Sequence, residues 1–230
     1  MLIGSQSLLS EAPLTAHVRI PNSEIRTEFR KWIQKDFNSR MTPERRGKSV
    51  ELLTAMVDGY FSEFANDFGT FVLKAVPQRI FGSVEAAYQN YVYAYFSGAA
   101  DVVKPKWTTV MGVEAGDGRV DMAAHSGARG TIVEFKRFGH PVKKGYREVE
   151  RLRLSEGTTA ALDQCDTRHY RAMLPKEVKI VCEYGIAFLG PYCAIEARLL
   201  EWDDGKGWVI KRKYTAEDDE LRRDKTYCIT

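Results

Sequence analysis

The sequence lacks the features of a membrane-spanning or disulfide-stabilised protein. No apolar run approaches the roughly 18 residues that suggest a transmembrane helix, and the first residues lack the basic start and sustained apolar stretch of a signal peptide. The four cysteines are scattered and form no CxxC pair, which argues against a zinc site and a disulfide framework. We therefore expect an intracellular protein, cytoplasmic or nuclear, with reduced thiols and no membrane partner.

The chain also lacks internal repeats, low-complexity segments and a large excess of charge. Its 230 residues are 44% hydrophobic and 28% charged, which is enough apolar surface for a core. The net charge of +3 is compatible with a polyanionic partner but does not require one. The length favours one domain, or one domain with an extension.

The first third of the chain has a helical pattern. After a short strand within residues 1–20, apolar residues at helical spacing predict helices over about 24–37 and 49–75. Gly69 is expected to interrupt or end the second helical segment. We interpret residues 1–75 as a helical N-terminal extension that packs as a cover on residues 76–230.

The remainder of the chain alternates between helical and strand patterns. Polar and basic residues at 140–155 are interpreted as a loop or a mobile segment. The expected elements, in chain order, are a helix over 83–99, strands over 106–113, 119–126 and 131–138, a helix from Ser155 or Thr158 to about Leu174, and strands over 178–190, 191–202 and 206–214. This order predicts an α/β fold with a mixed sheet flanked by helices.

The clearest hairpin, 119–137, carries the residues with the most chemical potential. Asp121 lies on its first strand, and Glu134 and Lys136 lie two residues apart on the second, so their side chains leave the same face of the sheet. Charges buried without partners cost on the order of several kcal/mol. Two carboxylates that face one place suit Mg²⁺, which prefers oxygen ligands and offsets their repulsion. The spacing alone leaves open a purely structural cross-strand ion cluster.

A metal held by Asp121 and Glu134 would suit phosphodiester hydrolysis. Such an ion binds a phosphate oxygen and a water molecule, lowers the pKa of that water and stabilises charge in the transition state. Lys136 beside it could orient or help deprotonate the water, or neutralise the phosphate.

These segments resemble a known family. GRVD at 118–121 and TIVEFKR at 131–137 resemble the D-x(n)-E-x-K core of the PD-(D/E)XK nuclease superfamily. The resemblance extends to a branch whose members often sit C-terminal to an AAA-ATPase-like domain. The supporting segments are IPNSEIRTEF at 20–29, VEAAYQNYVYAYFSG at 84–98, VEAGDGRVD at 113–121, AALDQCDTRHY at 160–170 and GIAFLG at 185–190. The chain departs from the branch at Gln89, where His is usual, and at Val113, where Arg is usual.

The resemblance implies a restriction-endonuclease-like fold and a set of site residues. The implied catalytic residues are Asp121, Glu134, Lys136 and Gln164, and the implied metal ligands are Glu85, Asp121 and Glu134. The implied ion is Mg²⁺, with Mn²⁺ as a substitute. For Gln164 a solvated helix face is the alternative, and for Tyr170, which matches the same segment, packing is favoured over a functional role.

The resemblance also implies a nucleic acid as the partner, DNA before RNA. Arg119, Arg137, Lys143 and Lys144 are the basic residues expected to contact its backbone. For Arg119, pairing with Asp121 or Glu114 is the alternative. A homodimer and an ATPase domain or partner remain open. The competing hypothesis is a nuclease-fold module that is catalytically weak or inactive and binds nucleic acid or a protein.

Overall fold

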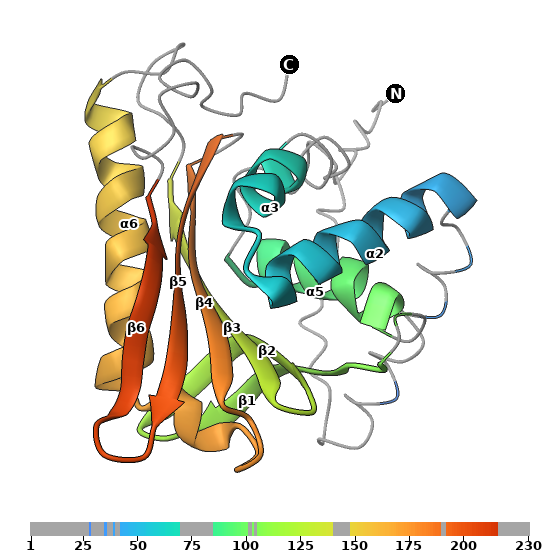
Figure 1. Cartoon of the computed structure of the whole chain (residues 1–230). Helices are drawn as coiled ribbons and strands as arrows, with labels where there is room; N and C mark the ends of the chain where they lie inside the picture. The colour runs from blue at the N-terminus through green and yellow to red at the C-terminus, as the bar shows by residue number, and fades with distance from the viewer. Residues whose placement is uncertain are drawn as a thin grey trace, which may run out of the picture.

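A six-stranded sheet lies between two helical layers in the computed structural model of the chain (Figure 1). The structure describes residues 42–69, 85–100, 103, 105–139, 148–189 and 192–215, with the single residues 28, 35 and 39; for residues 45, 85–88, 91, 148 and 150 it describes the backbone only. In this part of the chain, no helix is long and apolar enough to cross a membrane.

The strands follow one another across the sheet in chain order. They are β1 (Thr108–Ala115), β2 (Gly118–Ser126), β3 (Arg129–Phe138), β4 (Ile180–Leu189), β5 (Tyr192–Asp203) and β6 (Gly207–Tyr214). β3 and β4 pair in parallel, and every other neighbouring pair is antiparallel. The predicted α/β class, with a mixed sheet flanked by helices, is confirmed.

The parallel pair requires a crossover, which α6 (Glu148–Thr167) supplies along one face of the sheet (Figure 1). Two glycines allow α6 to approach closely. A Cβ atom on Gly185 of β4 would lie 2.3 Å from the carbonyl oxygen of Thr158, and one on Gly157 of α6 would lie 3.0 Å from Cβ of Ala187. α6 therefore packs almost backbone to backbone against the middle of the sheet.

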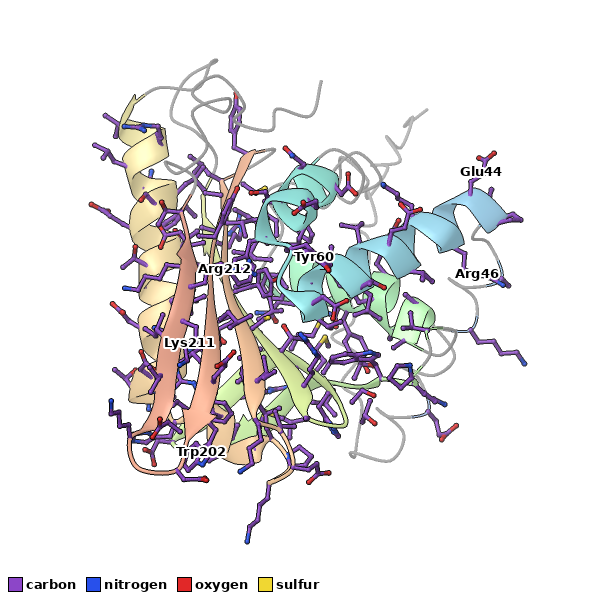
Figure 2. All side chains as sticks on the ribbon, viewed as in Figure 1. Glu44, Arg46, Tyr60, Trp202, Lys211 and Arg212 are labelled. Atoms are coloured by element: carbon purple, nitrogen blue, oxygen red, sulfur yellow. The ribbon has the colours of Figure 1, made fainter. Side chains whose placement is uncertain are left out.

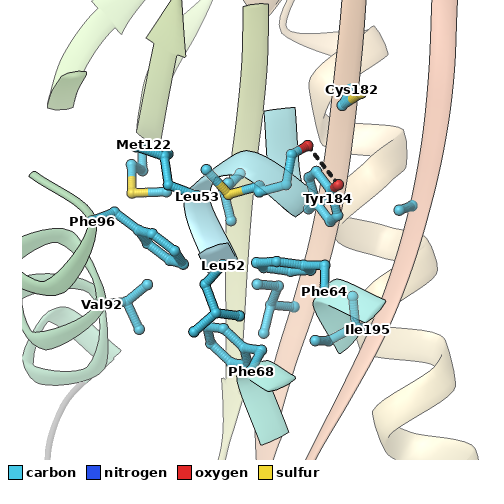
Figure 3. Packing of buried hydrophobic residues seen from close by; sticks show 14 of the residues in the cluster. Leu52, Leu53, Phe64, Phe68, Val92, Phe96, Met122, Cys182, Tyr184 and Ile195 are labelled. Carbon is cyan, nitrogen blue, oxygen red and sulfur yellow. Dashed lines mark hydrogen bonds between the residues drawn. The ribbon is translucent and has the colours of Figure 1, made fainter. Parts of the chain in front are cut away.

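Three helices cover the opposite face: α2 (Pro43–Asp58), α3 (Phe61–Asp67) and α5 (Glu85–Ala100). Leu52, Phe64 and Phe96 from these helices lie in one buried cluster with Tyr184 of β4, and Phe64 lies between the rings of Phe96 and Tyr184 (Figure 3). The hydroxyl of Tyr184 donates a hydrogen bond of 2.7 Å to the carbonyl oxygen of Met56 (Figure 3). The helices over 43–67 therefore share one hydrophobic core with the sheet.

The helical segment that was predicted over 49–75 is interrupted at Gly59, a break that the pattern did not indicate. The predicted end at Gly69 stays a prediction, because residues 70–75 lie outside the described residues. Gly59 has a φ of +73°, a left-handed conformation that ends α2 and that glycine adopts without strain. Its carbonyl oxygen accepts a hydrogen bond from the Arg212 guanidinium of β6. The break is thus held by a residue distant in sequence.

Two further boundaries differ from the predictions. α6 begins at Glu148, so the expectation of a loop over 140–155 is wrong for its second half, where Leu154 is buried against the sheet. The helix also ends at Thr167 rather than near Leu174, and a 3₁₀ turn, η3 (Tyr170–Met173), follows it. The predicted strand within 1–20 and most of the predicted helix over 24–37 lie outside the described residues.

The close approach of α6 to β4 predicts that Gly185→Ala destabilises the fold. The added methyl group would collide with backbone of α6, and such overpacking costs about 1–3 kcal/mol. Gly47→Ala is the matched control, because a Cβ atom at this exposed α2 position meets nothing within 4 Å and alanine favours helix. Urea unfolding should show a loss for Gly185→Ala and no loss for Gly47→Ala. Equal stability of the two variants would contradict the packing described here.

Candidate active site

The candidate site lies where β2 and β3 separate. Their ladder runs from Ser126↔Arg129 to Met122↔Val133 and ends there. Asp121 precedes Met122 on β2 and lies just beyond the end of this ladder. There a side chain replaces the backbone as the partner of β3, since Asp121 Oδ2 accepts a hydrogen bond of 2.8 Å from the backbone N–H of Phe135. Asp121 is therefore fixed against β3 at the point where the two strands part.

Alternation along β3 sends neighbouring side chains to opposite faces. Val133 and Phe135 enter the core beneath the three helices, whereas Glu134 and Lys136 face α6. The Glu134 side chain is 3% exposed and that of Lys136 is 26% exposed, and Lys136 Nζ lies 3.1 Å from Glu134 Oε1. The lysine thus pairs with a buried carboxylate and still reaches solvent.

The electrostatics of Glu134 are unfavourable for a bare carboxylate. Burial, followed by the negative charge of Asp121, raises the pKa of Glu134 to about 8, although Lys136 and a hydrogen bond from the backbone of Asp121 oppose the shift. Glu134 Oε2 is buried and has no hydrogen-bond partner among the described residues. A buried acceptor without a partner is costly, so this oxygen is suited to a proton or a cation.

The end of α6 contributes an ordered chain of hydrogen bonds to the site. Lys136 Nζ donates to Gln164 Oε1 at 2.5 Å, and Gln164 Nε2 donates to the Tyr170 hydroxyl at 2.7 Å. The Tyr170 hydroxyl in turn donates to the carbonyl oxygen of Arg119 at 2.9 Å. Gln164 therefore faces the site rather than solvent. Tyr170 packs in a buried cluster, as the sequence interpretation favoured, but its hydroxyl also joins α6 to β2.

A buried ion cluster, not anticipated from the sequence, holds the end of α6 against the sheet. Glu183 of β4 is fully buried between Arg171, whose Nε lies 2.7 Å from Oε1, and Arg198, whose Nε lies 2.6 Å from Oε2. The Arg171 Nε contact is close enough for an ion pair but is not aligned as a hydrogen bond. Both arginines also pair with Asp166 near the end of α6. The signal in the sequence was a charged residue within each of two apolar strands.

The remaining predicted site residues either lie outside the described residues or make other contacts. Glu85 is the first residue of α5, and its side chain lies outside the described residues, as do Lys143 and Lys144. The exposed Arg119 side chain donates to the carbonyl oxygen of Gly112 at 2.7 Å. Alternation places Arg137 on the sheet face opposite to Lys136.

Asp121 and Glu134 form a two-carboxylate site that fits a hard cation in its chemistry. Both side chains can bind a metal through oxygen atoms, and Glu134 has a buried oxygen without a hydrogen-bond partner. The negative charge of Asp121 also makes the ionised form of Glu134 less favourable, and a cation would offset this repulsion. Within the described residues, no group of three His, Cys, Asp or Glu side chains could hold a metal. The candidate metal ligands close together in this part of the chain are therefore two, Asp121 and Glu134.

Comparisons with known proteins give no relative. The chain matches no protein-family model, and neither curated proteins nor solved structures match it. A function must therefore be argued from the geometry and chemistry of the site.

The pKa of Glu134 predicts how folding depends on pH without divalent metal. The folded protein keeps the Glu134 proton up to about pH 8, whereas the unfolded chain loses it near 4.5. The folded state holds more protons between these values, so the free energy of unfolding should fall as pH rises through that window. Glu134→Gln, which cannot ionise, should therefore gain stability relative to wild type on going from pH 5 to pH 8 (about 1–3 kcal/mol).

Urea unfolding with a chelator present measures this difference. Glu156→Gln, which changes an exposed carboxylate of α6, is the control and should track wild type at both pH values. A stability difference between wild type and Glu134→Gln that does not change with pH would contradict the burial argument.

Proposed function

We propose that the chain is a metal-dependent nuclease that hydrolyses phosphodiester bonds, as an endonuclease acting on DNA. The observation that carries the proposal is the buried Glu134 oxygen without a hydrogen-bond partner, beside Asp121 and Lys136. A carboxylate pair with a lysine at its edge can hold a cation and a phosphate together. In the neighbouring ion cluster, Glu183 Oε1 also lacks an aligned hydrogen bond, but it lies 2.7 Å from Arg171 Nε. The ion pair of Glu134 with Lys136 is made instead by its other oxygen, Oε1.

In this proposal Asp121 and Glu134 hold Mg²⁺, with Mn²⁺ as a substitute. When bound, such an ion lowers the pKa of a coordinated water and stabilises negative charge on the phosphate. Lys136 has three N–H donors, of which one points to Glu134 and one to Gln164. The third donor is available to a phosphate oxygen or to the attacking water, and the partial exposure of Lys136 lets substrate approach it.

Two further observations support the proposal. The described elements form a mixed sheet flanked by helices, which is compatible with the restriction-endonuclease-like fold that forms part of the proposal. We expect the exposed Arg119, two residues before Asp121 on β2, to contact a phosphate near the site.

Cleavage of DNA should require divalent metal, Asp121 and Lys136. We expect wild type to cleave plasmid or single-stranded DNA with Mg²⁺ or Mn²⁺. Asp121→Asn and Lys136→Met should each lose at least about 100-fold in kcat/KM, because each removes a group that acts in the transition state. Asparagine retains an oxygen for the Phe135 N–H, which protects the fold.

Lys211→Met is the matched control for the loss of a lysine. Lys211 is an exposed residue of β6, at the far edge of the sheet from β2 and β3 (Figure 2), so its variant should retain wild-type cleavage. An RNA substrate tests the preference for DNA. Equal cleavage by wild type, Asp121→Asn and Lys136→Met would contradict the proposal.

The alternative function is a nuclease-fold module that binds nucleic acid or a protein without efficient cleavage. It is favoured by the presence of only two candidate metal ligands close together within the described ranges. Calorimetric titration with Mn²⁺ discriminates between the two functions. The nuclease should bind Mn²⁺ at a site that Asp121→Asn weakens by about 10-fold or more, and binding unaffected by this substitution would favour the module.

A further inference from the structure

A chain of hydrogen bonds runs from Lys136 through Gln164 and Tyr170 to the backbone carbonyl of Arg119. The two end groups determine which atom donates at each step. The backbone carbonyl of Arg119 can only accept, so the Tyr170 hydroxyl uses its single proton there. Its oxygen is then left to accept from Gln164. At the other end, the ammonium group of Lys136 can only donate.

Only one orientation of the Gln164 amide satisfies both neighbours. Nε2 must face the Tyr170 hydroxyl, and Oε1 must face Lys136. A flipped amide would place its NH₂ group against the ammonium group, donor against donor, and its oxygen against the hydroxyl. The flip would break the bond to Lys136 and pull the Tyr170 proton from the Arg119 carbonyl.

We infer that Tyr170 is a positioning residue, which selects the amide orientation of Gln164 and so holds Lys136 Nζ between Gln164 and Glu134. The inference rests on the proposed nuclease function for its catalytic consequence. With two of its donors fixed in this way, the Lys136 ammonium has its third N–H directed by the protein rather than by solvent. In this arrangement Tyr170 acts on Lys136 through Gln164.

The position of the Tyr170 hydroxyl is itself fixed from several sides. Tyr170 is 1% exposed, and the next residue, Arg171, is held by Glu183 and Asp166. A Cβ atom on Gly118, at the start of β2, would lie 3.3 Å from the hydroxyl oxygen. The hydroxyl therefore cannot move far without displacing β2 or η3.

The first experiment is a double-mutant comparison of cleavage kinetics. Tyr170→Phe keeps the ring and removes the hydroxyl, so we expect kcat to fall about 10-fold while KM stays within about threefold. In the Gln164→Glu variant, both terminal atoms of the side chain at position 164 are oxygens, so this side chain accepts a hydrogen bond from Lys136 in either orientation. Adding Tyr170→Phe to Gln164→Glu should therefore lower kcat by less than about threefold relative to Gln164→Glu alone. A purely structural tyrosine would lower kcat by the same factor in both backgrounds, and that result would overturn the inference.

The second experiment reads the amide directly and does not require cleavage. The Gln164 side-chain NH₂ signal, identified by its loss in Gln164→Glu, should exchange with solvent about 10-fold faster in Tyr170→Phe than in wild type. Unchanged exchange would overturn the inference. If wild type cleaves no DNA but the amide is protected in a Tyr170-dependent way, the nuclease proposal fails while the positioning of Gln164 stands.

Discussion

The burial of Glu134 on the α6 face of the sheet is the constraint on which the rest of the site depends. A carboxyl group in this place must be protonated, paired or bound to a cation, and the neighbouring charge of Asp121 makes the bare anion still less favourable. Lys136 satisfies one of its oxygens. The backbone N–H of Phe135 fixes Asp121, and Gln164 holds Lys136 from the side of α6.

The two carboxylates of the α6 face that are almost fully buried, Glu134 and Glu183, are treated differently. Glu183 is flanked by Arg171 and Arg198, so its charge is compensated by the protein itself. Glu134 has one partly exposed lysine, which lies 3.1 Å from Oε1. Oε2 of Glu134 and Oε1 of Glu183 both lack an aligned hydrogen bond within the described structure, but the Glu183 oxygen lies 2.7 Å from Arg171 Nε. The same layer thus contains a complete ion cluster and an incomplete one. This contrast is the physical reason for regarding the Glu134 site as functional and the Glu183 cluster as structural.

Close packing of α6 on the sheet connects the fold to the candidate site. Because Gly185 and Gly157 allow α6 to approach the sheet, the end of that helix brings Gln164 within hydrogen-bond reach of Lys136. The Glu183 cluster then fixes the end of α6 and the start of η3. A side chain at either glycine would meet atoms of the facing layer.

The sequence by itself determined the order of most elements, the mixed sheet and the shared face of Glu134 and Lys136, because alternation and helical spacing are local properties of the chain. The break at Gly59, the early start of α6 and the hydroxyl bonds of Tyr170 were decided only by the tertiary structure. Each depends on a partner distant in sequence: Arg212 for the carbonyl of Gly59, the sheet for Leu154, and Arg119 for Tyr170. The local spacing of apolar residues indicates which face of a helix or strand a side chain lies on. The identity of its partner depends on how the helices pack on the sheet.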